Sequence, residues 1–196
     1  MNISKAIRKQ NKSYKHFLLS MCFIFFILPC ALYFSGQYRN VFYIIFLSFI
    51  EILILLCTVS KIRNCNLKVD CDGIKLKIEY GLRKKSLVIT CEKVVFVHTE
   101  DLSGGDFNIV ILTVSKFRND YIKAIDKKFL EGHPFAAFHY YNIKKMNPEE
   151  QYFYIIIKSG GYNKYKLLDT MYKNCVYALY TDEALNKIIE YRSGKP

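Results

Sequence analysis

Two pairs of residues have side chains suited to nucleophilic or acid-base chemistry. Cys91 and His98 are the types found in thiol-imidazole pairs, and His133 and His139 flank Pro134. Side chains alternate between faces along a strand, so Cys91 and His98, seven residues apart, are expected to point in opposite directions. The other two histidines are expected in a loop, as solvated or interfacial groups, with a metal or acid-base role as the alternative. We predict no catalytic residue and no metal site.

Motifs that build phosphate, zinc or nucleophile sites are absent from the sequence. It contains no GxGxxG, GxxxxGK[ST], HExxH or GxSxG. The seven cysteines form no CxxC pair, and in a reducing compartment we expect them to be small buried apolar residues. The sequence therefore predicts neither an enzyme nor a cofactor.

Glu51 is a carboxylate within an otherwise apolar run. An acid near the middle of a membrane span costs about 2.5–3.5 kcal/mol on insertion scales and usually faces a partner or water. We favour a protonated Glu51 that is hydrogen-bonded to the neighbouring helix or to a second copy of the protein. The alternative is an ion or proton site, for which the two apolar runs supply few other polar groups.

Two apolar segments precede the rest of the chain. No charged residue lies within 17–38, and Glu51 is the only one within 41–60. Helices over 17–36 and 41–60 would each be long enough to cross a hydrocarbon core of about 30 Å. The alternatives are a cleaved signal peptide, which has a shorter apolar core, and two buried helices, which would show a polar face. We predict a transmembrane hairpin over residues 17–60.

Cations flanking the apolar segments predict the orientation of this hairpin. The connector carries only Arg39, whereas residues 1–16 contain five cations and no acid, and Lys61 and Arg63 follow the second segment. Positive flanks stay in the cytoplasm. The sequence thus predicts a multi-pass protein of the cell membrane with both termini cytoplasmic, a basic tail at 1–16 and a cytoplasmic domain at 61–196.

A net charge of +12 favours an anionic partner, and for a membrane protein the nearest one is the lipid surface. Arg83, Lys84 and Lys85 follow Gly81, where one predicted strand ends and the next begins. We predict that this triplet contacts anionic headgroups, with a solvated turn as the alternative. Nucleic acid is not expected as a partner, because its recognition would need more cations and interleaved aromatic residues on the same surface.

Alternating apolar residues predict strands in the cytoplasmic domain, and helical spacing predicts a terminal helix. The predicted strands are 67–71, 74–80, 86–91, 94–98, 107–114, 152–158, 164–168 and 175–180. In TDEALNKIIEYR, Thr181 is the expected N-cap, and Leu185, Ile188, Ile189 and Arg192 share a face.

An insertion at about 115–150 separates the central strands. Aromatic and aliphatic residues recur every fourth position in its first part, which predicts a helix: Phe117, Tyr121, Ile125 and Phe129. Such a helix would place Phe117 and Tyr121 at the headgroup level, or alternatively pack the same line against the sheet. Residues 131–150 are expected to be irregular because of Pro134 and Pro148.

A family resemblance rests on three features. These are the predicted hairpin, the segment DGIKLKIEYGLRKKSLVITCEKVVFVHTE at 72–100, and the helix TDEALNKIIEYR. Together they resemble bacterial pleckstrin-homology-like domains of small membrane proteins. The resemblance implies an α+β membrane protein, in which two transmembrane helices precede a β-rich, partly open barrel capped by the C-terminal helix. In eukaryotic lipid-binding members the turn corresponding to 69–74 carries cations; here it carries Asp70 and Asp72, so lipid contact is expected from another face.

These features predict a membrane-anchored, non-enzymatic binding or scaffolding module. Its expected partners are anionic lipid headgroups and a protein partner or a second copy of the chain. The alternatives are an accessory subunit of a larger membrane complex and an enzyme acting at the membrane surface, which would need a polar cluster that the sequence does not reveal.

Overall fold

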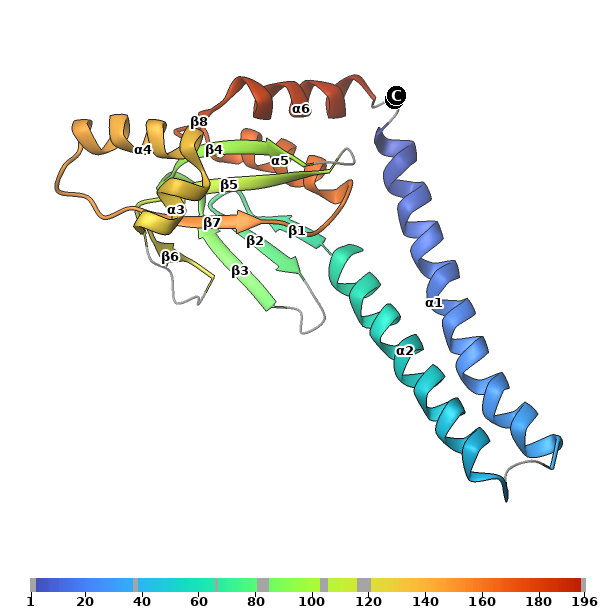
Figure 1. Cartoon of the computed structure of the whole chain (residues 1–196). Coiled ribbons are helices and arrows are strands. Elements are labelled where there is room, and N and C mark those ends of the chain that lie inside the picture. Colours follow the sequence, from blue (N-terminus) through green and yellow to red (C-terminus); the bar gives the residue numbers. More distant parts are fainter. Residues whose placement is uncertain are drawn as a thin grey trace.

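The computed structural model describes residues 3–36, 39–65, 67–80, 85–102, 106–115 and 121–194 (Figure 1). It consists of two long N-terminal helices followed by an α+β domain. The helices are α1 (Ile3–Phe34), α2 (Val41–Cys65), α3 (Lys127–Gly132), α4 (Pro134–Met146), α5 (Asn163–Asn174) and α6 (Asp182–Ser193). The strands are β1 (Leu67–Cys71), β2 (Lys75–Tyr80), β3 (Lys85–Thr90), β4 (Val94–Asp101), β5 (Phe107–Thr113), β6 (Lys123–Ala124), β7 (Phe153–Ile157) and β8 (Leu179–Tyr180).

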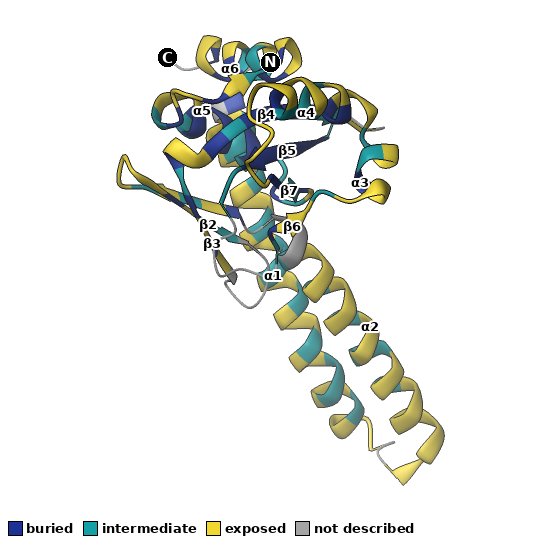
Figure 2. Ribbon diagram, turned by 90° about the vertical axis from the view of Figure 1, so that its left-hand side faces the viewer, coloured by how far each residue is buried: buried dark blue, intermediate teal, exposed yellow. Residues whose placement is uncertain are grey.

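Helices α1 and α2 are long and apolar enough to cross a membrane by length and composition. They pack against each other and project away from the domain, and their large apolar side chains are exposed, as Figure 2 shows along most of the hairpin. An apolar surface of this extent is stable only when lipid or another protein covers it. The structure thus agrees with the two predicted spans, while the side on which the domain lies stays a prediction.

Helix α1 begins at Ile3, so the predicted basic tail is helical from that residue onward. Its composition explains this, because Lys, Arg, Gln and Ala are good helix formers and no Gly or Pro lies within 3–16. The helix therefore continues without a break from its apolar part into its basic part.

The strands form two sheets that are not closed into a barrel. Strands β1, β2 and β3 make an antiparallel sheet, and the second sheet has the order β6-β7-β5-β4-β8. In the second sheet β8 is parallel to β4, and the other neighbours are antiparallel. The predicted α+β class is confirmed, but the barrel is not formed: α5 packs beside β1, and no ladder among the described strands joins the two sheets.

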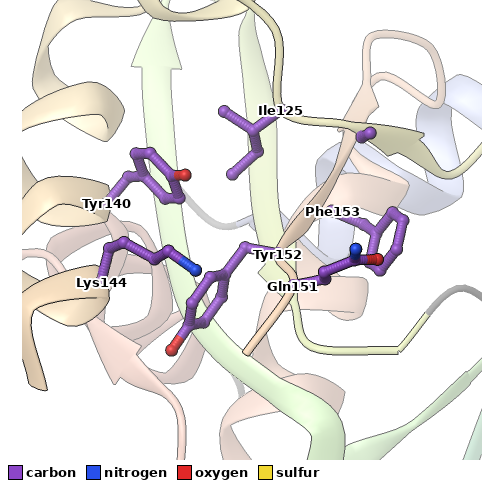
Figure 3. Close-up of a pocket in the computed structure, with 7 residues that line it drawn as sticks. Ile125, Tyr140, Lys144, Gln151, Tyr152 and Phe153 are labelled. Atoms are coloured by element: carbon purple, nitrogen blue, oxygen red, sulfur yellow. The ribbon is translucent and has the colours of Figure 1, made fainter. Parts of the chain in front are cut away.

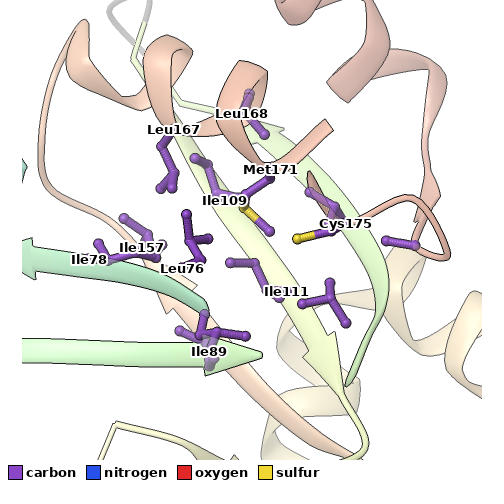
Figure 4. Close-up of a cluster of buried hydrophobic side chains, with 14 of the residues drawn as sticks. Leu76, Ile78, Ile89, Ile109, Ile111, Ile157, Leu167, Leu168, Met171 and Cys175 are labelled. Atoms are coloured by element: carbon purple, nitrogen blue, oxygen red, sulfur yellow. The ribbon is translucent and has the colours of Figure 1, made fainter. Parts of the chain in front are cut away.

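The main core lies between the two sheets and helices α5 and α6 (Figure 4). In this view Leu76 and Ile89 of the small sheet approach Ile109 and Ile111 of β5, with Met171 of α5 above them. A second, smaller core lies on the other face of the large sheet, under α3 and α4. Strand β5 is therefore buried on both faces, which explains its continuous apolar sequence.

Both ends of the domain follow the predicted local chemistry. Asp72 in the β1-β2 turn accepts hydrogen bonds from the backbone N–H groups of Ile74 and Lys75. Thr181 caps α6 by accepting a hydrogen bond from the N–H of Ala184. The predicted apolar face of α6 is correct only in part, because Ile188 is buried whereas Ile189 is exposed.

Two predicted strands are wrong. Residues 164–168 belong to helix α5, and of 175–180 only Leu179–Tyr180 forms a strand. The alternation in KYKLL suggested a strand, but the buried positions of α5 include Lys164, Leu168 and Met171, which recur with helical spacing.

The insertion also differs from its prediction. Residues 123–124 form strand β6, and the helix begins only after Asp126, which caps α3 by accepting from the N–H of Phe129. Residues 134–146 are helical rather than irregular, because Pro134 occupies the first turn of α4, where its missing N–H costs nothing.

Candidate functional site

Phe17 and Lys61 mark where the two long helices leave their apolar region. The ammonium of Lys61 lies 6.0 Å from the centroid of the Phe17 ring. Phe17 is the first residue of the apolar run in α1, and Lys61 is the first cation after the apolar run in α2. The two runs thus end at one level. Because a helix rises about 1.5 Å per residue, residues 3–16 extend roughly 20 Å beyond that level.

The basic part of α1 is attached to the domain. Ile3 is 0% exposed and belongs to the main core, and Ile7 packs against the same core. The side-chain amide of Gln10 accepts a hydrogen bond from the backbone N–H of Tyr162 at 3.0 Å and donates to the carbonyl of Gly160 at 3.5 Å. An apolar anchor and two polar contacts therefore fix α1 against the domain.

The turn between β7 and α5 contacts the continuations of both long helices. Gly160 has φ of 129°, and a Cβ added there would lie 2.5 Å from Cδ2 of Leu67, the residue that opens β1 shortly after α2. Gly161 has φ of 52°, and its added Cβ would lie 2.8 Å from Oε1 of Gln10. The close approach at Gly160 needs glycine, whereas at Gly161 the positive φ favours glycine and the end of the Gln10 side chain can shift. We call Gln10, Leu67, Gly160, Gly161 and Tyr162 the membrane joint.

The membrane joint was not predicted from the sequence. The segment SGGYN indicated only a turn, and residues 1–16 were described by their charge. One signal was available, because Ile3, Ile7, Gln10 and Tyr14 recur at helical spacing and would have indicated a helix with a covered face.

The predicted lipid-contact residues are described only in part. Arg83, Lys84 and Phe117 lie outside the described residues, and of Lys85 only the backbone position at the start of β3 is given. Tyr121 is half-buried in a turn before β6, not on the predicted helix.

The flanks of the basic triplet lie near the end of α2. Leu67 pairs with Tyr80, the last residue of β2, and Tyr80 pairs with Lys85, the first residue of β3. Leu67 itself follows shortly after α2 ends at Cys65. The connection that carries the triplet therefore starts and ends beside the point where the chain leaves α2.

Glu51 is half-buried on α2. Its neighbours Ile52 and Leu53 are exposed, whereas Leu47, Glu51 and Ile54 recur with helical spacing and are all half-buried. Since α1 is the helix that packs against α2, Glu51 lies on the α1-facing side. Among the described residues no hydrogen bond or ion pair is found for its carboxylate.

The thiol-imidazole pair is not brought together. Cys91 lies in the main core near Cys175, whereas His98 contacts Phe135 of α4 on the opposite side of the large sheet. Burial raises the pKa of the Cys91 thiol, and burial raises that of Cys175 as well. Thiols with raised pKa values are poor nucleophiles, so these cysteines act as core residues.

The three histidines of the domain do converge, which the sequence did not reveal. We call His98, His133 and His139 the histidine cluster. The ring of His98 stacks on Phe135 with 4.6 Å between centroids, and the ring of His139 stacks on Phe96 at 4.9 Å. Helix α4 causes this convergence, because it carries His139 and Phe135 over β4.

Each of two histidines in the cluster has a polar partner. Nδ1 of His98 lies 3.0 Å from the hydroxyl of Thr181, and Nδ1 of His133 lies 2.6 Å from a carboxylate oxygen of Glu100. Burial lowers the pKa of His98 below its ordinary value of 6.5. A hydrogen bond from its own backbone N–H lowers the pKa of Glu183, whose carboxylate lies 3.8 Å from His98.

A cavity of about 240 Å³ opens beside β6 and β7 (Figure 3). It is lined by residues that include Tyr140, Lys144, Gln151 and Tyr152. The ammonium of Lys144 donates hydrogen bonds to the backbone carbonyls of Pro148 and Glu150, both at 2.6 Å. Lys144 therefore holds the α4-β7 connection, and little of its donor capacity is left for a ligand.

No group of three or more metal-ligating side chains has metal-binding geometry within the residues that the structure describes. The fold and the contacts define an α+β protein with two long, apolar, unburied N-terminal helices, one of which is fixed to the domain at the membrane joint. Comparison with protein-family models, with curated proteins and with solved structures found no match.

Proposed function

We propose that this protein is a membrane-anchored binding or scaffolding module without enzymatic activity, which holds its α+β domain in a fixed pose at the cytoplasmic face of the cell membrane. The observation that supports this most is the continuity of α1. One helix carries an apolar, exposed segment at one end and inserts Ile3 into the domain core at the other. A flexible linker would let the domain tumble, whereas this connection holds it at one orientation.

The cations flanking the apolar segments support the cytoplasmic placement. Residues 3–16 of α1 carry no acid, and Lys61 lies at the same level as Phe17. Positive charge at this level on both helices favours the cytoplasmic side. Both termini would then be cytoplasmic.

Anionic headgroups are the proposed lipid partner of Arg83, Lys84 and Lys85. The connection that carries them is flanked by Tyr80 and Lys85, beside the end of α2. Each cation near an anionic surface is worth about 1 kcal/mol, so three would favour one pose of the domain by about a hundredfold. The β1-β2 turn is not the proposed contact, since backbone N–H groups of Lys75 and Ile74 lower the pKa of Asp72 and keep it anionic.

A pleckstrin-homology-like relationship is part of this proposal. The antiparallel meander followed by a terminal helix supports it, as does the position of that helix against the large sheet. The open sheets and the added α3-α4 pair are differences from the partly open barrel that the relationship implies.

The lipid contact can be tested with the full-length protein in nanodiscs of neutral or anionic lipid. Hydrogen exchange of the peptide covering residues 80–90 is expected to slow in anionic nanodiscs, and high salt should remove the effect. Substitution of Arg83, Lys84 and Lys85 by Ser should abolish the lipid dependence.

A matched control removes the same charge elsewhere. Lys127, Lys128 and Lys145 are exposed cations on α3 and α4. Their substitution by Ser should leave the lipid dependence of residues 80–90 intact. If both triple variants behave alike, the basic triplet is a solvated turn and the lipid part of the proposal fails.

A second candidate is an accessory subunit of a larger membrane complex. Its supporting observation is the outer face of α4, where Phe138 is 63% and Met146 81% exposed. Helix α4 lies at the end of the molecule away from the membrane hairpin in both Figure 1 and Figure 2, so lipid would not cover this face. Cross-linking and mass spectrometry in mild detergent distinguish the two, because an obligate subunit should bring its partner along in fixed ratio.

A further inference from the structure

The part of α1 beyond its apolar run has two faces of different character. Ile3 and Ile7 pack on the domain core and Gln10 bonds the β7-α5 turn, so these residues mark the covered face. Exposed cations lie on the opposite side, because successive residues turn by about 100° around the axis of a helix. We call them the basic face of α1: Arg8, Lys9, Lys12 and Lys15.

The basic face has no counter-charge within the described part of the protein. Residues 3–16 contain no acid, and no ion pair is found for its cations among the residues that the structure describes. Arg8 and Lys15 lie four and three residues from Lys12, spacings at which like charges repel on a helix surface. The first turn of α1 also lacks an acid that would interact with the helix dipole. An external anion would therefore stabilise this part of α1.

Lipid headgroups are in reach of only half of the basic face. At about 1.5 Å per residue, Lys15 lies roughly 3 Å and Lys12 about 8 Å beyond the level of Phe17, which is comparable with a headgroup layer of about 5–8 Å. Lys9 and Arg8 lie roughly 12–14 Å beyond that level. Side chains of a helix lean toward its N-terminus, and Ile3 at that end is buried in the domain rather than near the membrane.

The membrane joint keeps the outer half of the basic face away from lipid. Gln10 contacts Gly160 and Tyr162, and Ile3 lies in the main core, so α1 cannot bend down onto the membrane while the domain is folded. The partner of Arg8 and Lys9 must then approach from the cytoplasmic solution above the headgroups.

We propose that the basic face of α1 binds an acidic helical segment of a partner protein close to the membrane surface. A helix with Glu or Asp at every third or fourth position presents a row of carboxylates, which matches the spacing of the cations. Lys and Arg donate charge-assisted hydrogen bonds to such carboxylates. Single-stranded nucleic acid is a poorer fit, because the exposed residues between the cations include Asn11 and Ser13 but no aromatic ring for a base to stack on. This inference names the partner of the binding module proposed above, and it rests on that proposal.

A helical probe peptide tests the proposal on the full-length protein in nanodiscs of neutral lipid. The probe is an alanine-rich peptide of about 16 residues with Glu at every fourth position, and a matched peptide carries Gln at these positions. The Glu peptide is expected to bind and to dissociate as the salt concentration rises, whereas the Gln peptide should not bind. Equal binding of the two peptides, or binding of neither, would overturn the proposal.

Paired variants locate the binding on α1. Arg8→Gln combined with Lys9→Gln removes the two outer cations and keeps a good helix former at both positions. The affinity for the Glu peptide should fall about fivefold, the size expected for the loss of two exposed ion pairs. Lys127→Gln combined with Lys128→Gln removes the same charge from exposed positions of α3 and should leave the affinity unchanged. If both double variants lose affinity equally, the peptide responds to net charge alone and the proposal fails.

Nanodiscs of anionic lipid distinguish a protein partner from lipid. Headgroups in reach of Lys12 and Lys15 compete for only part of the peptide contact, so the fivefold effect at Arg8 and Lys9 should persist. Its disappearance in anionic nanodiscs would make lipid the partner of the whole face and overturn the proposal. Hydrogen exchange of residues 80–90 reports the lipid contact separately, so the two proposals can fail independently.

Discussion

Buried polar side chains in this protein differ in how fully they are satisfied. Lys164 is fully buried, and its ammonium bonds the carbonyls of Phe107 and Lys158 and pairs with Asp106. Because the Lys164 ammonium already has three partners, it stabilises the fold and is not available to bind a ligand. Glu51 contrasts with it, because its carboxylate faces α1 without a partner among the described residues.

Glu51 is therefore expected to contribute to the contact of α2 with α1 or to association between copies of the chain. We expect Glu51→Gln to be tolerated, since the amide keeps most of the hydrogen-bonding capacity of a protonated acid. Glu51→Leu should weaken self-association by about 1 kcal/mol, the size of one interhelical hydrogen bond. Sedimentation equilibrium in detergent measures this change.

Ser48→Ala serves as the control for Glu51. The Ser48 hydroxyl already donates to the Ile44 carbonyl of its own helix, so its loss should not affect association. If Glu51→Leu associates as strongly as the unchanged protein, Glu51 has no role in self-association. If Glu51→Gln loses the protein's activity while it still assembles, an ion site is indicated instead.

Among the elements, the β7-α5 turn contacts both α1 and the first residue of β1. Its glycines lie against Leu67 and Gln10, and their positive φ values are strained for any other residue. The turn therefore holds α1 and β1 together in addition to reversing the chain. A substitution at Gly161 should disturb α1 through Gln10, and one at Gly160 should disturb the start of β1 through Leu67.

Gly160→Ala is expected to lower the free energy of unfolding by about 3 kcal/mol, because strain at its φ adds to the overlap of a new Cβ with Leu67. The same change should raise proteolytic cleavage within residues 3–16, because the shifted turn weakens the hydrogen bonds of Gln10 to Gly160 and Tyr162. Denaturant unfolding and limited proteolysis measure the two effects.

Gly132→Ala provides a matched control for this substitution. A Cβ at Gly132 meets nothing within 4 Å, and the residue ends helix α3, where Ala is preferred to Gly. Stability should be unchanged or slightly higher. If Gly160→Ala proves as harmless as Gly132→Ala, the membrane joint does not hold α1.

In the whole molecule, α1 runs as one helix from the domain core to the far end of the apolar hairpin. Ile3 is buried about 20 Å beyond the level of Phe17, so a fragment without α1 would expose part of the main core. Experiments on the domain should for this reason keep the hairpin.

Orientation in the membrane is the prediction on which the lipid proposal depends. Reporters fused to either terminus, active only in the cytoplasm, should both be active, because the flanking cations resist translocation. A reporter that is active only outside would reverse the orientation and remove the argument for anionic cytoplasmic lipid.

Features that depend on nearby residues could be predicted from the sequence. Two apolar runs, the β1-β2 alternation around Gly73 and the cap at Thr181 each follow from local spacing, and the structure agrees with all three. Short segments were less well determined, since KYKLL fits both a strand and a helix until the rest of α5 is considered.

Features that join distant residues became evident only from the packing of the folded chain. Gln10 meets Gly161 and Tyr162, and His98 meets His139, because packing of α1 on the domain and of α4 on β4 brings these positions together. Helical spacing of Ile3, Ile7 and Gln10 indicates that α1 has a covered face, but no local pattern identifies the distant residues that cover it. The same reason explains the open sheets, because strand pairing depends on where α5 packs, and a period of two in the sequence says only that a strand has one buried face.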